Sequence, residues 1–110
     1  MTPQHAALSG GRWKELPFTV QMANVGSEVE RALRWKAKNN PAYCEKALDR
    51  ALELLDLTLE SAAGFHRLRE LARAREFLLD YFLGSNQYSS TEAGWRKYFF
   101  QFACAANKNR

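Results

Sequence analysis

The amino-acid sequence predicts an all-α fold, an antiparallel up-down four-helix bundle, from three observations. Apolar residues recur at spacings of three and four in four successive stretches, as they do on one face of a helix. Turn-forming residues separate these stretches by short links, which favours antiparallel neighbours. No stretch alternates apolar and polar residues as a strand would. With 110 residues, the chain has the size of one domain.

The chain divides into a flexible N-terminal leader (residues 1–16), a helical domain (residues 17–107) and a short basic tail (residues 108–110). A Gly-Gly pair makes the leader flexible, and Pro17 marks the start of the domain. The first helix is expected over about residues 19–38, because its apolar side chains share one face and basic side chains occupy the opposite face.

The second helix is expected over about residues 41–61, because Asn40 is a good N-cap and Pro41 suits the first helical position. Its apolar arc is the widest of the four, which predicts the most buried helix. Its carboxylates form one outward stripe, which indicates a solvated face: Glu45, Asp49, Glu53, Asp56 and Glu60.

The third helix is expected over about residues 65–83, and the fourth ends near residue 106. Between them lies a polar loop, residues 84–90, followed by a capping box formed by Ser89 and Glu92. The length and side chains of the loop make it a possible recognition loop, although connection and capping explain it equally well.

The expected core lies on the shared apolar faces, with the second and third helices as a central hairpin. Its members are Met22, Val25, Val29, Leu33, Leu48, Ala51, Leu55, Leu68, Leu71, Leu79, Phe82, Trp95, Phe99 and Phe102.

The sequence contains few of the residue patterns that catalysis or metal binding requires. Cys44 and Cys104 form no Cys-x-x-Cys pair and have no histidine nearby, so free thiols and no metal are expected. Neither His5 nor His66 has a spaced Ser, Cys or Asp partner, and both glycine-rich nucleotide-binding signatures are missing. We therefore expect a non-enzymatic protein without catalytic residues and without cofactors.

The N-terminal residues and the apolar stretches also bear on location. The first eleven residues lack the apolar region of a signal peptide, and no apolar stretch is long enough to span a membrane. A cytoplasmic location without a membrane partner is therefore expected, and two unpaired cysteines fit a reducing compartment.

Arg75 is the most unusual residue, because helical geometry places it in the centre of the third helix's apolar face. A buried guanidinium needs a carboxylate or several carbonyl groups. Glu28 is the best candidate partner, and Thr58 and Tyr98 could complete a polar network. The functional interpretation is a recessed polar pocket that binds an anionic group or orders a partner. The structural interpretation is a buried ion pair that fixes helix register, or an arginine that extends to a gap or a subunit interface. The structural interpretation is favoured, because structural ion pairs are the commoner source of such residues.

Two groups of residues are candidates for contact with a partner. A protein interface is expected at Phe77, Tyr81 and Phe100, since large apolar residues on outward faces mark such interfaces. The net charge of the chain is +4, and residues 62–110 hold the whole excess of positive charge. The candidate basic surface consists of Arg69, Arg73, Arg96 and Lys97.

These observations favour a non-enzymatic helical interaction module that binds a protein partner or itself as a homo-oligomer. The alternative is a protein associated with nucleic acid or with a nucleotidyltransferase through its basic C-terminal half. An enzyme with Arg75 and Glu28 as an anion site ranks third.

Two segments resemble a family of small uncharacterised prokaryotic helical-bundle proteins. They are residues 24–31, Asn-Val-Gly-Ser-Glu-Val-Glu-Arg, and residues 80–88, Asp-Tyr-Phe-Leu-Gly-Ser-Asn-Gln-Tyr, followed by Trp95 and Tyr98-Phe99. The resemblance covers residues 16–107 and implies a compact helical fold without an assigned activity.

The chain is also similar in layout to HEPN domains, small helical bundles that accompany nucleotidyltransferases or act as RNases. Active HEPN domains carry an arginine and a histidine a few residues apart near the last helix. No histidine follows Arg96 in this chain, so the resemblance implies the bundle and not the catalytic activity.

Overall fold

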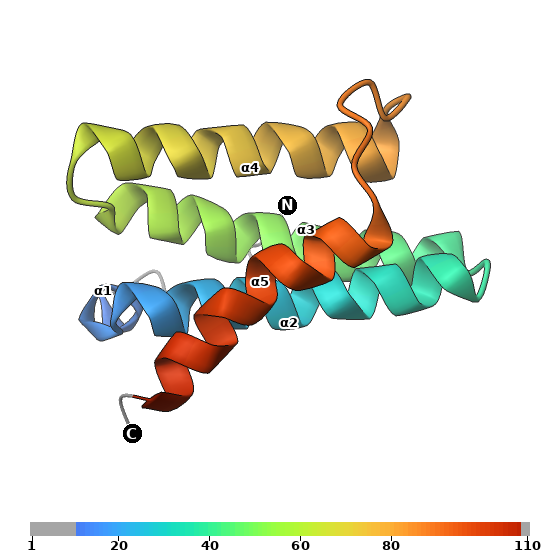
Figure 1. Ribbon diagram of the computed structural model, residues 1–110. Helices are drawn as coiled ribbons and strands as arrows, with labels where there is room; N and C mark the ends of the chain where they lie inside the picture. Colours follow the sequence, from blue (N-terminus) through green and yellow to red (C-terminus); the bar gives the residue numbers. More distant parts are fainter. Residues whose placement is uncertain (1–10, 109–110) are drawn as a thin grey trace.

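The structure, a computed structural model, describes residues 11–108, which form five helices and no strand (Figure 1). In chain order the helices are α1 (Arg12–Glu15), α2 (Phe18–Ala37), α3 (Pro41–Ser61), α4 (Phe65–Leu83) and α5 (Glu92–Lys108). The predicted all-α class is confirmed, and the short helix α1 adds to the four that were expected. Residues 1–10 of the predicted leader and residues 109–110 of the predicted tail lie outside the described residues.

Local capping signals determine where the longer helices begin. The side chain of Asn40 accepts a hydrogen bond from the backbone N–H of Tyr43 at 3.1 Å, and Pro41 occupies the first turn of α3, as predicted. The predicted cap of α5 at Ser89 is wrong, because Thr91 takes this role. The Thr91 hydroxyl accepts from the N–H of Gly94 at 2.9 Å, and this satisfies a donor of the first turn.

Helix α2 is the centre of the arrangement. It packs along α3 on one side, while α5 crosses it obliquely on another side (Figure 1). Helix α4 lies against α3 and packs less closely on it than α2 does. The predicted central hairpin of the second and third long helices is therefore wrong, because α2 makes the extensive contacts that were expected of α4.

The predicted core residues are buried, with three exceptions on α4. The prediction for Leu68 is wrong, since 40% of its surface is exposed. Leu79 and Phe82 are only half-buried. The face that α4 buries consists of Leu71, Ala74 and Leu78, so Leu79 and Phe82 lie beside it, and residues 65–70 at the beginning of α4 are all exposed. Every other predicted core residue is buried, and Leu55 and Leu71 have no exposed surface.

Part of the predicted leader, residues 11–16, contains the short helix α1, and Trp13 and Leu16 pack against the core. Trp13 of α1 is only 3% exposed, and its indole N–H donates a hydrogen bond to the Thr58 hydroxyl of α3 at 3.1 Å. The backbone carbonyl of Trp13 accepts a hydrogen bond from the Gln21 side chain at 2.7 Å. Helix α1 thereby closes one end of the α2–α3 pair.

Gly26 allows α2 and α5 to approach closely. A Cβ atom at this position would lie 2.8 Å from the Cβ of Phe99, which is far closer than van der Waals contact. The Phe99 atom is at the base of its side chain, so a change of rotamer cannot relieve the clash. The crossing of α2 and α5 therefore depends on the missing side chain at residue 26.

We predict that Gly26→Ala lowers the free energy of unfolding by about 1–2 kcal/mol, because the cost of overpacking exceeds the gain in helix propensity. Urea unfolding followed by circular dichroism measures this change. Ser27→Ala is the matched control, because Ser27 is the next residue on α2 and is exposed. Its effect should stay within about 0.5 kcal/mol. A Gly26→Ala protein as stable as the wild type would contradict the close approach.

Candidate functional site

A groove of about 780 Å³ runs between α2 and α5 on the surface of the protein. Its apolar lining comes from Val29 and Leu33 of α2 and from Trp95 and Phe99 of α5. Helix α5 crosses α2 obliquely (Figure 1), and side chains of both helices line the groove. We call it the α2–α5 groove.

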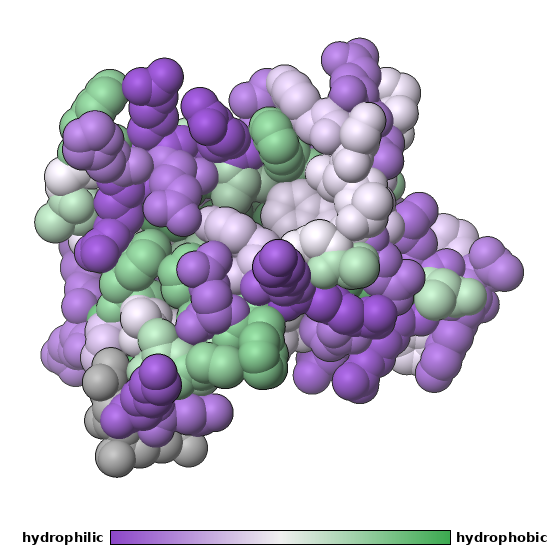
Figure 2. All heavy atoms as spheres, viewed as in Figure 1, coloured by the Kyte–Doolittle hydropathy of each residue, from purple (hydrophilic) through white to green (hydrophobic). Residues whose placement is uncertain are grey.

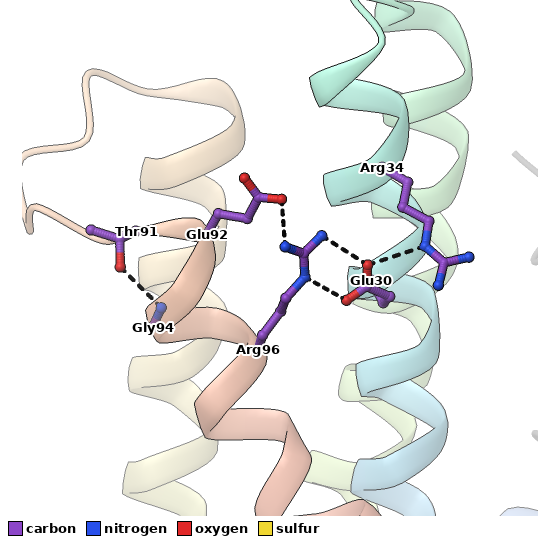
Figure 3. A network of polar contacts seen from close by, with 6 residues as sticks. All are labelled: Glu30, Arg34, Thr91, Glu92, Gly94 and Arg96. Atoms are coloured by element: carbon purple, nitrogen blue, oxygen red, sulfur yellow. Dashed lines mark hydrogen bonds and ion pairs between the residues drawn. The ribbon is translucent and has the colours of Figure 1, made fainter.

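A network of ion pairs crosses the groove near the beginning of α5. Figure 3 shows Arg96 between two carboxylates, with hydrogen bonds of 2.8 and 3.0 Å to Glu30 of α2. Arg96 also contacts Glu92 at 2.7 Å, and Arg34 contacts Glu30 at 3.2 Å. The hydrogen bond from Arg96 lowers the pKa of the Glu30 carboxyl, and the same contact raises the pKa of Arg96. The network therefore compensates the charge of Arg96 within the molecule.

Phe100 is a large apolar side chain that is exposed beside the groove. It is 68% exposed, and it lies between the α2–α5 groove and a second hollow of about 510 Å³. Gly94, Lys97, Tyr98 and Gln101 line the second hollow together with Phe100. Figure 2 shows apolar surface beside the lower half of α5, next to hydrophilic side chains. Phe100 thus forms an apolar ridge between two hollows.

The predicted pairing of Arg75 with Glu28 is wrong. Arg75 pairs with Asp56 of α3 at 2.8 Å, and its side chain is 36% exposed rather than buried. Glu28 contacts Arg50 at 3.2 Å and Arg31 at 3.6 Å instead. Arg75 lies at the edge of the α3–α4 contact and not in the core, because α4 covers so little of α3.

The other two members of the predicted polar pocket also lie in separate places. Thr58 is fully buried, where its hydroxyl accepts from Trp13 and donates to the backbone carbonyl of Leu54 at 2.8 Å. The Tyr98 hydroxyl donates to the Glu70 carboxylate at 3.1 Å, and burial raises the pKa of Tyr98 well above its usual value. The structure therefore does not bring the four predicted residues into one pocket.

Of the three predicted interface residues, only Phe100 is exposed. Phe77 is half-buried, because its ring stacks on that of Tyr88 at a centroid distance of 4.1 Å. Tyr81 is also half-buried, with its ring edge-on to Trp95 at 6.4 Å and the Lys36 ammonium 5.5 Å from its centroid. The predicted outward orientation of Phe77 is wrong, because the 84–90 loop covers it.

The four predicted basic residues are exposed but do not share one surface. Arg96 and Lys97 line the α2–α5 groove, whereas Arg73 lines a different pocket between α4 and α5. Arg69 is exposed one turn before Arg73. Arg96 is already paired with two carboxylates, whereas Lys97, the other cation of α5 at the groove, forms no ion pair with the residues that the structure describes.

Sequence reasoning overlooked the small residues on α2 that line the groove. Ala23, Gly26 and Ser27 lie on the α5-facing side of this helix, at positions i, i+3 and i+4. A cluster of small side chains at helical spacing is a signal of close helix contact, and it was available in the sequence.

The described residues show no arrangement typical of a metal centre. Within residues 11–108, no three His, Cys, Asp or Glu side chains are placed to hold a metal ion. Cys44 and Cys104 are free and half-buried. None of the helices in this part of the chain is long and apolar enough to cross a membrane.

Comparisons with protein-family models, with curated proteins and with solved structures found no match. The resemblance to small prokaryotic bundle proteins and to HEPN domains therefore stays a prediction, and the site is interpreted from its own residues.

Proposed function

We propose that this chain is a non-enzymatic helical interaction module that associates with a second copy of itself through the α2–α5 groove. The observation that carries the proposal is Phe100, a large apolar side chain that is 68% exposed beside an apolar hollow. Covering such a ring stabilises a complex by about 1.5–3 kcal/mol. In the single chain the Phe100 ring is in contact with water, so its removal from water on association is a substantial driving force.

A second copy is the partner that this surface fits best. A twofold interface requires one surface to be complementary to itself, so that residue i meets residue j in both directions. The Phe100 ridge lies next to a hollow lined by Val29 and Leu33, so each copy offers both a projection and a recess. The rim also carries charges of both signs, Glu30 and Lys97 among them, which suits contact with an identical surface.

Sedimentation equilibrium over a range of concentrations tests the proposal. The wild-type chain should reach the mass of a dimer, and Phe100→Ser should weaken the dimer at least about tenfold, because each copy loses one buried ring. Phe65→Ser is the matched control, because Phe65 is 71% exposed on α4, away from the groove. A chain that stays monomeric at high concentration would contradict the proposal, as would a Phe100→Ser dimer of unchanged affinity.

Nucleic-acid binding is the alternative, and it receives less support. The candidate basic residues are divided between the groove and the α4–α5 pocket, and two carboxylates compensate Arg96. This alternative requires retention on heparin that falls steeply as salt is raised. Retention lost in Lys97→Gln would favour it over self-association.

Two further expectations belong with this proposal. The four long helices are proposed to form an up-down bundle, which the opposite directions of consecutive helices in Figure 1 support. A cytoplasmic location is proposed as well, which the two free thiols, Cys44 and Cys104, support because thiols persist in a reducing compartment.

A further inference from the structure

A second recess of about 370 Å³ lies between α4, α5 and the loop that joins them. Ala74 and Phe77 of α4 and Trp95 and Tyr98 of α5 form its apolar walls. The volume falls within the range of about 300–1,000 Å³ typical of small-ligand sites, which are lined mostly by apolar and aromatic groups. We call this recess the loop pocket, and it does not include Phe100.

The loop wall of the pocket is held rigidly in place. The Asp80 carboxylate accepts hydrogen bonds from the backbone N–H groups of Gln87 and Tyr88 at 2.9 and 3.1 Å. The Asn86 side chain accepts from the N–H of Ser90 at 2.8 Å and donates to its carbonyl at 3.0 Å. These bonds fix the position of Ser89 and Ser90 at the pocket, so a ligand would not have to order the loop.

The Phe77–Tyr88 stack joins the loop to the apolar wall. The two rings are nearly parallel, with an interplanar angle of 9°, and the Tyr88 hydroxyl donates to Glu76 at 2.7 Å. The outer face of Phe77 is thus covered by the loop. The Tyr88 ring therefore holds the Phe77 ring in place as part of the pocket wall.

The pocket lining carries one cation and one anion, Arg73 and Glu70. Arg73 lines the pocket and forms no ion pair with any residue in the described range 11–108. The other charged lining residue, Glu70, already accepts a hydrogen bond from the Tyr98 hydroxyl. Ser89 and Ser90 of the loop also line the pocket. Arg73 is the charged group left to bind a ligand, and its guanidinium fits a carboxylate with two hydrogen bonds.

Trp95 forms part of the wall of the loop pocket and also part of the wall of the α2–α5 groove. It is only 7% exposed, and its indole N–H, which has no hydrogen-bond partner among residues 11–108, is buried as well. Trp95 therefore contributes ring surface to the pocket, and Arg73 is the group that binds the charge of a ligand.

We propose that the loop pocket binds a small planar aromatic carboxylate, with the ring against Trp95 and Phe77 and the carboxylate on Arg73. The aromatic walls provide stacking surfaces, and Arg73, which has no ion pair among residues 11–108, is the cation that pairs with the carboxylate. This site is separate from the surface proposed for self-association, although Trp95 forms part of both walls.

Titration of the ¹⁵N-labelled full chain with indole-3-acetate and with its neutral amide, indole-3-acetamide, tests the proposal. The two compounds have nearly the same shape, so the difference in affinity reports the charge. We expect the acid to shift the NMR signals of the Trp95 indole N–H and of the Ser89 and Ser90 amides. The acid should bind about ten times more tightly than the amide, as expected for a charge-assisted hydrogen bond.

Arg73→Gln should remove the preference for the acid and leave the binding of the amide unchanged. Arg69→Gln is the matched control, because Arg69 is exposed on the same helix and does not line the pocket. No shift at Trp95 with either compound, up to the solubility limit, would overturn the proposal. Equal affinities of acid and amide for the wild type would also overturn it, because the charge then selects nothing. Neither result affects the mass measurement that tests self-association.

Discussion

Trp13→Ala should lower the free energy of unfolding by about 3–5 kcal/mol, the largest effect expected of any single substitution in α1. Trp13 is 3% exposed, so its removal leaves a cavity where α1 meets α3. The Thr58 hydroxyl also loses the donor that reaches it at 3.1 Å, inside a part of the protein that water does not enter. A small domain has a total stability of about 5–15 kcal/mol, so this loss is a large fraction of it.

Urea unfolding followed by circular dichroism measures the change, and Trp13→Phe separates its two causes. Phenylalanine keeps most of the buried ring but cannot donate to Thr58, so a smaller loss of about 1–2 kcal/mol is expected. Lys14→Ala is the control for local effects, because Lys14 is the next residue of α1 and is exposed. If Trp13→Ala unfolded at the wild-type urea concentration, α1 would be the loose leader that the sequence alone suggests.

The sequence could not reveal the role of Trp13, because α1 is a single turn. Four residues are too few to show a helical period, and the Gly-Gly pair before them is typical of a flexible segment. The partner, Thr58, lies 45 positions away. In contrast, Asn40-Pro41 is a local signal, and the structure confirms the helix that it predicts.

For a similar reason, the sequence predicts the surroundings of some site residues and not of others. The exposure of Phe100 could be predicted, because its position away from the core face of α5 is a property of one helix. The Arg75–Asp56 pair could not, since the sequence does not say which carboxylate of α3 lies beside α4. The stacking of Phe77 on Tyr88 depends on a loop with positive φ angles at Asn86 and Ser89, which no side-chain pattern indicates.

Leu55→Ala should lower the free energy of unfolding by about 2–5 kcal/mol, because Leu55 has no exposed surface and its truncation creates a cavity between α3 and its neighbours. The same substitution at Leu68 is the matched control. Both leucines lie on the apolar face of their helix in the sequence, so periodicity alone assigns both to the core.

The structure distinguishes the two positions, because Leu68 is 40% exposed on the uncovered beginning of α4. Alanine there removes few contacts, so the free energy of unfolding should change by about 1 kcal/mol or less. Parallel urea titrations of the two variants measure the difference. Equal losses would mean that another element covers α4, and an unchanged midpoint for Leu55→Ala would contradict the core itself. The contrast between these two leucines tests where the core of this fold lies. If the core is formed mainly by α2 and the helices packed on it, the apolar face of a long helix is buried only where such a neighbour covers it.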